Sequence, residues 1–222
     1  GGTTGTTTNR GIEINGSKLL TSGGGNISLT GAGGSKSNNY GVIVTAASKL
    51  QSAAGNVSIT GAAGKASTGT GIGMLLDTTS TIVTTSGNIA ISGTGSTGAT
   101  GAANHGVQIN STKGVSSTAG NINIVGTSGT GTTNDVGVRI VGTSPLTTSG
   151  NITVAGTSNG KGTSNNFGVE VNNSTLTTTG PGAISITGNG GGQANNYGAY
   201  ITKSAKLQTA NGNATLIGSA GA

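Results

Sequence analysis

The chain has 222 residues, a formal net charge of +6, 46 glycines and no cysteine, and only 6% of its residues are charged. The lack of cysteine excludes a disulfide framework and a thiolate metal site, and no apolar run reaches the length of a membrane span. The basic residues are scattered singly, which disfavours nucleic-acid binding. Gly, Ser, Thr and Asn dominate, but Val, Ile and Leu recur at regular intervals, so a disordered chain is excluded.

Three short apolar patterns recur in the same order along the chain. The first is Gly-aliphatic-x-aliphatic, at 11–14, 41–44, 71–74, 106–109, 137–140, 168–171 and 198–201. The second is one aliphatic residue near a Thr/Ser pair, namely Leu20, Leu50, Ile82, Val115, Leu146, Leu176 and Leu207. The third resembles G-N-I-x-I-x-G and begins at Gly25, Gly55, Gly87, Gly120, Gly150, Gly182 and Gly212, with intervals of 30 to 33 residues.

Alternation of aliphatic and polar residues is typical of strands, and repeats of this length indicate a solenoid. Three strands per unit predict an all-β parallel β-helix of about seven triangular coils, right-handed by the general rule for parallel crossovers. A coil can bury its apolar faces only against its neighbours, which explains the repetition. We expect one repeat domain over residues 1–222. Because the chain begins without Met or a signal peptide, we interpret it as a mature product, a segment of a longer chain or a stacking fibre subunit.

Asparagine recurs at two turn positions, and we predict that both sets form structural Asn ladders between coils. One set follows the glycine of the third pattern: Asn26, Asn56, Asn88, Asn121, Asn151 and Asn213. The other precedes the first pattern, with Asp135 in place of Asn in one unit: Asn9, Asn39, Asn104, Asn166 and Asn196. Because several of these residues lie in N-x-S/T sequences, glycan attachment is the alternative.

Insertions concentrate before the first pattern, for example in 61–70 and 93–105, and in solenoids such insertions mark one lateral face. The residue just before this pattern varies in type, so we expect this column to be partly exposed. Its side chains either pack across a turn or form a lateral contact strip. The column consists of Arg10, Tyr40, Thr70, His105, Val136, Phe167 and Tyr197.

The charged residues do not form a catalytic set, and no catalytic, cofactor-binding or metal-binding residue is predicted. Glu13 and Glu170 face outward five coils apart, roughly 24 Å at the spacing of paired strands, which is too far to flank one glycosidic bond. Glu170 should instead form an exposed ion pair with Arg139 of the adjacent coil. His105 is the only histidine and has no acid beside it, which excludes a catalytic triad and a histidine metal site.

The G-N-I-x-I-x-G and G-V-x-V patterns resemble the repeats of filamentous-haemagglutinin-like exoproteins of two-partner secretion and of β-helical autotransporter passengers. The likeness covers all seven units. It implies a secreted right-handed β-helix at the bacterial cell surface that serves as a stalk or fibre of an adhesin.

Four functions therefore stand beside one another. The first is a non-enzymatic extracellular structural or adhesive segment, and the second is a filament or surface-layer subunit that stacks end to end. A carbohydrate-acting enzyme is disfavoured by the small number of carboxylates, and an ice-binding module by the irregular Thr positions. The expected partners are neighbouring copies or continuing repeats, and host or cell-surface glycans, with no nucleic acid and no membrane span.

Overall fold

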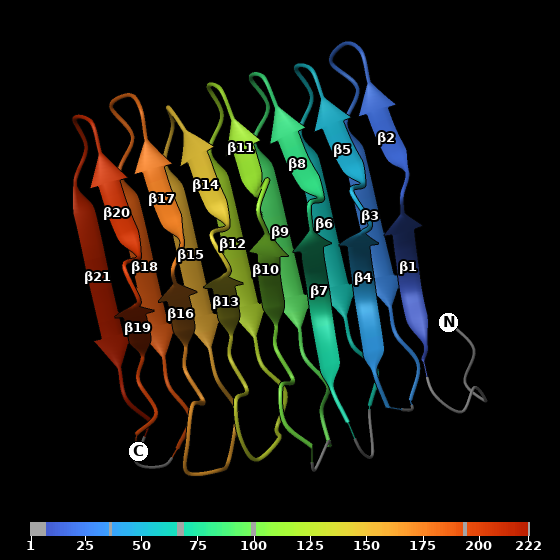
Figure 1. Cartoon of the computed structure of the whole chain (residues 1–222), viewed down its shortest axis with the longest axis vertical. Helices are drawn as coiled ribbons and strands as arrows, with labels where there is room; N and C mark the ends of the chain where they lie inside the picture. The colour runs from blue at the N-terminus through green and yellow to red at the C-terminus, as the bar shows by residue number, and fades with distance from the viewer. Residues whose placement is uncertain (1–7, 36, 66–68, 99–100, 193–194, 222) are drawn as a thin grey trace.

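The computed structural model describes residues 8–35, 37–65, 69–98, 101–192 and 195–221. In this part of the chain, 21 strands form three parallel seven-stranded sheets and no helix is present. The chain visits the three sheets in turn, so each round of three strands makes one coil. Figure 1 shows the seven coils side by side in chain order. The predicted parallel β-helix is confirmed. Residues 66–68 and 99–100 of the predicted variable segments lie outside the described residues.

Each sheet takes every third strand of the chain. The first sheet contains β1 (Arg10–Asn15), β4 (Asn39–Thr45), β7 (Gly71–Thr78), β10 (Val107–Ser111), β13 (Val138–Val141), β16 (Val169–Asn172) and β19 (Ala199–Thr202). The second contains β2 (Lys18–Thr21), β5 (Lys49–Ser52), β8 (Thr81–Thr84), β11 (Val115–Ser117), β14 (Pro145–Thr148), β17 (Thr175–Thr178) and β20 (Lys206–Thr209). The third contains β3 (Ile27–Ala32), β6 (Val57–Ala62), β9 (Ile89–Thr94), β12 (Ile122–Thr127), β15 (Ile152–Thr157), β18 (Ile184–Asn189) and β21 (Ala214–Ser219).

The core is a continuous stack of aliphatic side chains inside the coils. Each of the five inner coils contributes five of them, two from the first sheet, one from the second and two from the third. In the fourth coil these are Val107, Ile109, Val115, Ile122 and Ile124, all at most 1% exposed. At about 1.5–3 kcal/mol for each buried aliphatic side chain, stacking offsets the cost of ordering a chain this rich in glycine.

Two columns of glycine allow the third sheet to pass close to the first. The last glycine of the G-N-I-x-I-x-G pattern faces the glycine that begins the first-sheet pattern of the next coil. A Cβ added at Gly126 would lie 2.0 Å from the carbonyl oxygen of Gly137, and one added at Gly137 would lie 2.4 Å from the backbone nitrogen of Thr157. No side chain fits at these distances, so the geometry of the coil explains both recurring glycines.

The strand register corrects two positions predicted from the sequence. In the third coil Val42 pairs with Met74, so Gly73 occupies the glycine column and the pattern runs over 73–76 rather than 71–74. Gly71 and Gly73 both fit the sequence pattern, and only the pairing with the neighbouring strands distinguishes them. Ile72 therefore takes the place predicted for Thr70.

The first coil differs in the same way. Leu19, not Leu20, pairs with Leu50, because Lys18 aligns with Lys49. Leu20 consequently pairs with Gln51 on the outward face of the second sheet. This column was already too irregular in its Thr positions for ice binding, and Leu20 interrupts it further.

A ladder of buried serines holds the corner between the first and second sheets. The Oγ atom of Ser144 donates a hydrogen bond to the Val141 carbonyl at 2.6 Å and accepts one from the Ser111 backbone N–H at 2.8 Å. The same arrangement recurs one coil on, where the Ser174 hydroxyl accepts from the Ser144 N–H at 3.2 Å. At these two steps one serine hydroxyl satisfies a carbonyl in its own turn and an N–H of the preceding coil.

Replacement of Ser144 by Ala should lower the free energy of unfolding by about 1–3 kcal/mol, since it leaves buried backbone groups without partners. Urea denaturation followed by circular dichroism measures the loss. Ser116→Ala is the matched control, because Ser116 is half-buried and its hydroxyl makes no hydrogen bond within the described chain. The control should change stability by less than about 0.5 kcal/mol. Equal effects of the two substitutions would contradict the ladder.

Candidate functional site: a groove on the first sheet

The outward face of the first sheet carries one column of residues in register. From the first coil to the last it reads Glu13, Ile43, Leu75, Gln108, Arg139, Glu170 and Tyr200. Glu13 and Glu170 are five positions apart in this column, as the sequence predicted. The apolar side chains Ile43 and Leu75 pack with Ile72 and Tyr40 in a small cluster outside the core. Apart from Glu13 in the first coil, the charged and aromatic members lie at coils five to seven.

Arg139 and Glu170 form the predicted ion pair, with 2.7 Å between Nε and Oε2. The other carboxylate oxygen of Glu170 accepts a hydrogen bond from Asn172 Nδ2 at 3.0 Å. The expectation that this pair is exposed is wrong, because the Glu170 side chain is 7% exposed and that of Arg139 is 25% exposed. Neighbouring side chains above and below cover Glu170, and its two bonded oxygens compensate for the lost hydration.

Three of the four aromatic residues of the chain lie together beside this pair. The ring centroids of Phe167 and Tyr200 are 4.7 Å apart, and those of Tyr197 and Tyr200 are 5.3 Å apart with an angle of 14° between the planes. Phe167 is buried, Tyr200 is half-buried and Tyr197 is 49% exposed. The rings lie outside the main core, so they leave aromatic surface open to solvent.

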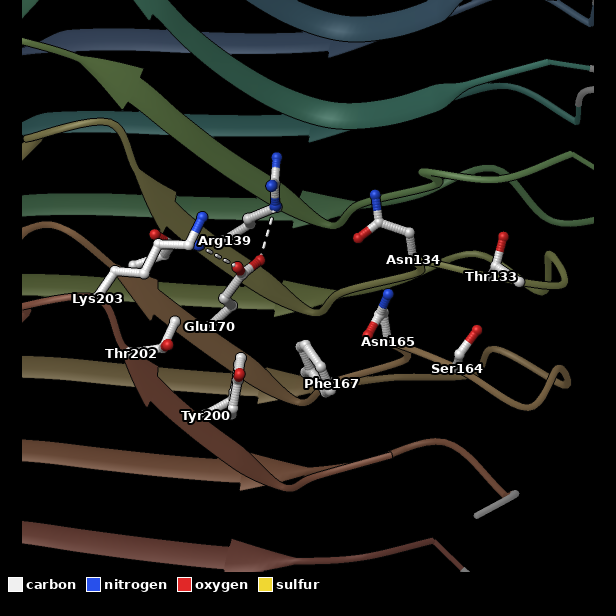
Figure 2. A pocket seen from close by; sticks show the side chains of 11 residues that line it. Thr133, Asn134, Arg139, Ser164, Asn165, Phe167, Glu170, Tyr200, Thr202 and Lys203 are labelled. Carbon is white, nitrogen blue, oxygen red and sulfur yellow. Dashed lines mark hydrogen bonds and ion pairs between the residues drawn. The ribbon is translucent and has the colours of Figure 1, made fainter. Parts of the chain in front are cut away.

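A groove of about 510 Å³ runs over this region, and Figure 2 shows the side chains that line it. Lys203 lies toward one end, whereas Thr133 and Ser164 lie in the turns at the other end. Between the two ends lie Phe167 and the column of Arg139, Glu170 and Tyr200. A volume in this range suits a small ligand, so this groove is the candidate site.

The predicted lateral contact strip is mostly buried, which corrects the expectation of partial exposure. His105, Val136 and Phe167 are at most 4% exposed, and Ile72, which replaces Thr70, is 6% exposed. Only the members toward the ends of the stack are accessible: Arg10 and Tyr40 are half-buried and Tyr197 is exposed. In the middle of the stack, residues of the coils above and below cover each member.

Arg10 and Tyr40, at the accessible N-terminal end of the strip, contact each other in a cation–π arrangement. The Arg10 guanidinium carbon lies 5.9 Å from the centre of the Tyr40 ring. Arg10 also pairs with Glu13, and its hydrogen bond lowers the pKa of that carboxyl. Glu13 engages Nη1 of Arg10, whereas Arg10 Nε is buried and has no hydrogen-bond partner among the described residues.

The exposed asparagine column forms the predicted ladder mainly through backbone N–H groups, with a hydrogen bond between amides at one step, from Asn121 Nδ2 to Asn88 Oδ1 at 3.2 Å. The side-chain oxygens of Asn26, Asn56, Asn88 and Asn121 each accept a hydrogen bond from the backbone N–H at the next coil, at 2.8 Å. Asn151 makes the same bond to Ala183, where the sixth coil lacks the asparagine. The side chains are exposed, so glycan attachment stays an untested alternative.

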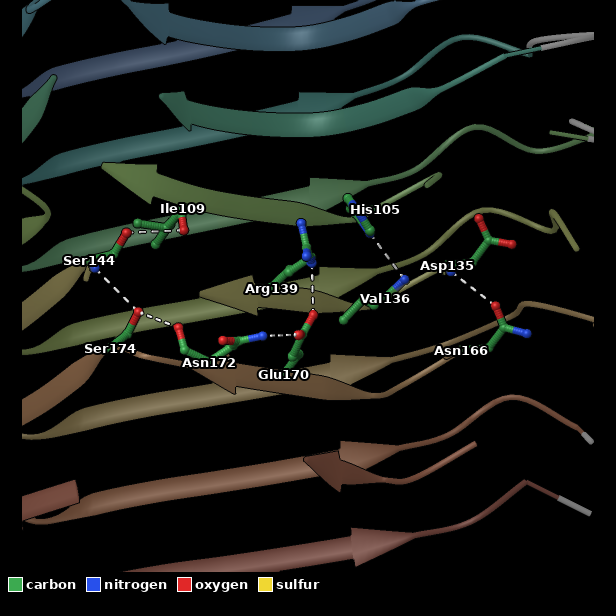
Figure 3. A network of polar contacts seen from close by, with 10 residues as sticks. All are labelled: His105, Ile109, Asp135, Val136, Arg139, Ser144, Asn166, Glu170, Asn172 and Ser174. Carbon is green, nitrogen blue, oxygen red and sulfur yellow. Dashed lines mark hydrogen bonds and ion pairs between the residues drawn. The ribbon is translucent and has the colours of Figure 1, made fainter. Parts of the chain in front are cut away.

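The second column is buried, and its bonds run in the opposite direction. The backbone N–H groups of Asn104, Asp135 and Asn166 donate to the side-chain oxygen one coil later, at 2.8–3.0 Å. Figure 3 shows the bond between Asp135 and Asn166 beside the Arg139–Glu170 pair. The residue before each of Asp135 and Asn166 has a left-handed backbone conformation. These residues are Asn134 and Asn165, with φ of 59° and 61°.

Asp135 and His105 are buried groups with shifted pKa values. Burial raises the pKa of Asp135 to about 6, against hydrogen bonds from Asn104 that lower it. Burial lowers the pKa of His105 to about 3, and the nearby positive charge of Arg139 adds to this effect. His105 Nδ1 accepts a hydrogen bond from the Val136 N–H at 3.2 Å, so the neutral ring is integrated into the stack. Both groups serve the fold rather than line the groove.

The described residues contain no group of three or more His, Cys, Asp and Glu side chains that could hold a metal ion. They also contain no helix with the length and hydropathy of a membrane span. No protein-family model, curated protein or solved structure matches the chain. The groove is therefore interpreted from its own geometry.

Sequence reasoning identified Phe167, Tyr197 and the Arg139–Glu170 pair, but it missed Tyr200, Lys203 and the turn asparagines Asn134 and Asn165. The signal for Tyr200 was available, because it follows Glu170 in the outward column of the strand pattern. The groove itself depends on the turns between coils, whose shape the pattern does not specify.

Proposed function

We propose that this chain is a non-enzymatic, extracellular structural or adhesive segment, the stalk or fibre section of a bacterial surface protein. The observation that supports it most is the in-register stacking of seven coils around a single aliphatic column. Each added coil lengthens such a rod by roughly 4.8 Å at the spacing of paired strands. A uniform rod with one modified lateral face suits a molecule that spans a distance and presents a contact surface.

The groove supports binding rather than bond cleavage. Glu170 is the only carboxylate among its described lining residues, and both of its oxygens are engaged by Arg139 and Asn172. Hydrolysis of a glycosidic bond uses two carboxyl groups on opposite sides of that bond. Glu170 instead holds the cationic and amide groups around it in place.

A filament of stacked subunits is the second candidate, and the open edges of the described sheets are compatible with it. Every residue of β21 is exposed, including Leu216, which continues the core column of Ile186 and is 49% exposed. Unpaired strand edges template the addition of further strands. A further coil, from the same polypeptide or from another copy, would cover these side chains.

Surface labelling tests the first candidate. Antibodies raised against the purified chain should bind unpermeabilised source cells, and protease added outside those cells should remove the signal. Signal only after permeabilisation would refute the extracellular role. Electron microscopy of the native material then separates the two candidates. Breaks roughly every 34 Å, seven coil rises, indicate stacked subunits, whereas a longer unbroken rod tethered to the cell indicates a continuous chain.

A further inference from the structure

We infer that the groove over coils five to seven binds an acidic saccharide, a pyranose chain that carries carboxylate groups. The inference deepens the proposed function, because an extracellular adhesive segment would meet such saccharides outside the cell. It rests on that function only for where the saccharide is found. The binding chemistry itself follows from the side chains in the groove.

Phe167 and Tyr200 supply apolar ring surface between the ends of the groove, and Tyr197, which is outside the lining, stacks against both rings. The chain has four aromatic residues, and Phe167, Tyr197 and Tyr200 gather within 5.6 Å of one another between ring centroids. Aromatic faces that stay accessible favour ligands with flat apolar surfaces. A pyranose ring offers such a surface through its C–H groups, while its hydroxyls remain at the edge for polar partners.

Two cationic groups define the charge of the ligand. Glu170 engages only Nε of Arg139, so the terminal nitrogens of the guanidinium have no hydrogen-bond partner among the described residues. Lys203 is exposed and forms no ion pair with any described carboxylate. A guanidinium presents paired N–H donors that match a carboxylate. Because Glu170 neutralises one of the two charges, the described lining is left with one net positive charge, which favours an anionic ligand over a neutral one.

Turn residues supply hydroxyl and amide groups at the other end. Asn134 and Asn165 lie in left-handed turns of adjacent coils, and Thr133 and Ser164 precede each of them. Thr133 and Ser164 form a β-bridge, so the two turns are held in register. Equivalent groups therefore recur at about the spacing of paired strands, and they can contact the hydroxyls of successive sugar units.

A single-stranded nucleic acid also combines stacking rings with negative charge, but it fits less well. Proteins that bind such strands line a groove with many cations that follow the phosphates. Here only Arg139 and Lys203 are present, and Glu170 offsets one of them. The acidic saccharide matches the rings, the free N–H donors of Arg139 and the turn groups that can contact sugar hydroxyls.

Calorimetric titration of the full chain tests the inference, with tetragalacturonate as the acidic probe, the corresponding neutral galactotetraose, and a short oligothymidylate. Tetragalacturonate should bind with saturation, more tightly than the neutral sugar, and less tightly as salt rises. Fluorescence gives a second measurement. The chain has three tyrosines and no tryptophan, and two of the tyrosines lie in the aromatic cluster, so tyrosine emission should change on binding.

The neighbouring coils provide matched substitutions that retain the fold. Arg139→Gln introduces the residue of the adjacent coil at Gln108, and Lys203→Asn introduces the residue at Asn173, which shares its positive φ. Each should weaken tetragalacturonate binding by roughly tenfold, as expected for a lost hydrogen bond to a charged group, and leave the neutral sugar unaffected.

Tyr200→Ile introduces the residue found at Ile43 in the same column, and it should weaken both sugars. Tyr40→Ile, in the separate cluster of the second coil, is the control and should change neither affinity. Circular dichroism verifies that each variant is folded.

The inference would be overturned if the wild-type chain did not bind tetragalacturonate. Tighter binding of oligothymidylate would also overturn it, as would unchanged affinity in Tyr200→Ile together with Arg139→Gln. These outcomes leave the surface-labelling result unaffected, so failure of the ligand and failure of the extracellular role are distinguishable.

Discussion

Replacement of Gly126 by Ala is expected to destabilise the solenoid by at least about 3 kcal/mol, the upper range for overpacking of a rigid core. The added Cβ would lie 2.0 Å from the Gly137 carbonyl oxygen and 2.7 Å from Cγ2 of Val138. The Gly137 carbonyl already accepts the Val107 N–H at 3.0 Å. Its displacement would therefore disturb the packing between two sheets and a hydrogen bond between two coils.

Urea denaturation of Gly126→Ala, followed by circular dichroism, measures this effect. Gly24→Ala is the control, because an added Cβ at Gly24 meets no atom within 4 Å. The control should alter stability by less than about 0.5 kcal/mol. If the free energy of unfolding of Gly126→Ala lies within about 1 kcal/mol of the wild-type value, the two sheets do not pass as close to each other as described here.

Asp135→Asn should stabilise the protein by about 3 kcal/mol at pH 8. Burial raises the pKa of Asp135 from 3.8 to about 6, so the folded state holds its proton more tightly than the unfolded state. The stability that this proton contributes is complete below pH 3.8 and is lost as the pH rises through 6. A shift of about two units corresponds to about 3 kcal/mol.

The local hydrogen bonds favour an amide at position 135. Asp135 Oδ2 and Asn104 Oδ1 are buried acceptors without partners. One coil later, Asn166 Nδ2 donates to the Gly162 carbonyl at 2.9 Å, which shows where an amide at this position in the column finds an acceptor. Asn at position 135 would keep Oδ1, which accepts hydrogen bonds from Asn104. It would replace the unpartnered Oδ2 with an NH₂ group that can donate a hydrogen bond.

Unfolding experiments between pH 4 and pH 8 test this prediction, with Asp77→Asn as a control of the same charge change at a half-exposed site. The advantage of Asp135→Asn should shrink toward pH 4. His105 makes the opposite contribution to stability in both proteins. Its pKa is lowered from 6.5 to about 3 in the folded state, so the stability that its neutral ring contributes is complete above pH 6.5 and is lost as the pH falls toward 3. The variant should therefore lose stability in acid more steeply than the wild type. A variant less stable than the wild type at pH 8 would show that the ionised carboxylate is required.

The sequence predicts the coil well because its signals are local. Alternation in a segment such as 122–124 places Ile122 and Ile124 inside, and recurrence every thirty residues aligns the coils. The predicted alignment between coils is wrong where two residues fit the same sequence pattern. Gly71 and Gly73 in the third coil, and Leu19 and Leu20 in the first, are distinguished only by pairing with neighbouring strands.

Burial outside the core is harder to predict than burial inside it. Glu170 and His105 point away from the aliphatic column, so the pattern suggests exposure. Stacked neighbours cover both residues in the structure. The groove requires still more information, since Phe167 and Tyr200 are far apart in sequence and come together only through the register of β16 and β19.

The glycine columns, and the asparagine ladders apart from Gly71 and Ala183, keep the same register from coil to coil, so coils can be added or removed without a change in how neighbouring coils pair. A deletion or duplication that begins and ends at equivalent positions, such as Gly120 and Gly150, joins two matching registers. Unequal recombination between repeats of the encoding gene would then shorten or lengthen the rod in whole coils and preserve every ladder. The outward residues form a grid in which each coil can vary separately, so a binding face can change without alteration of the core that supports it.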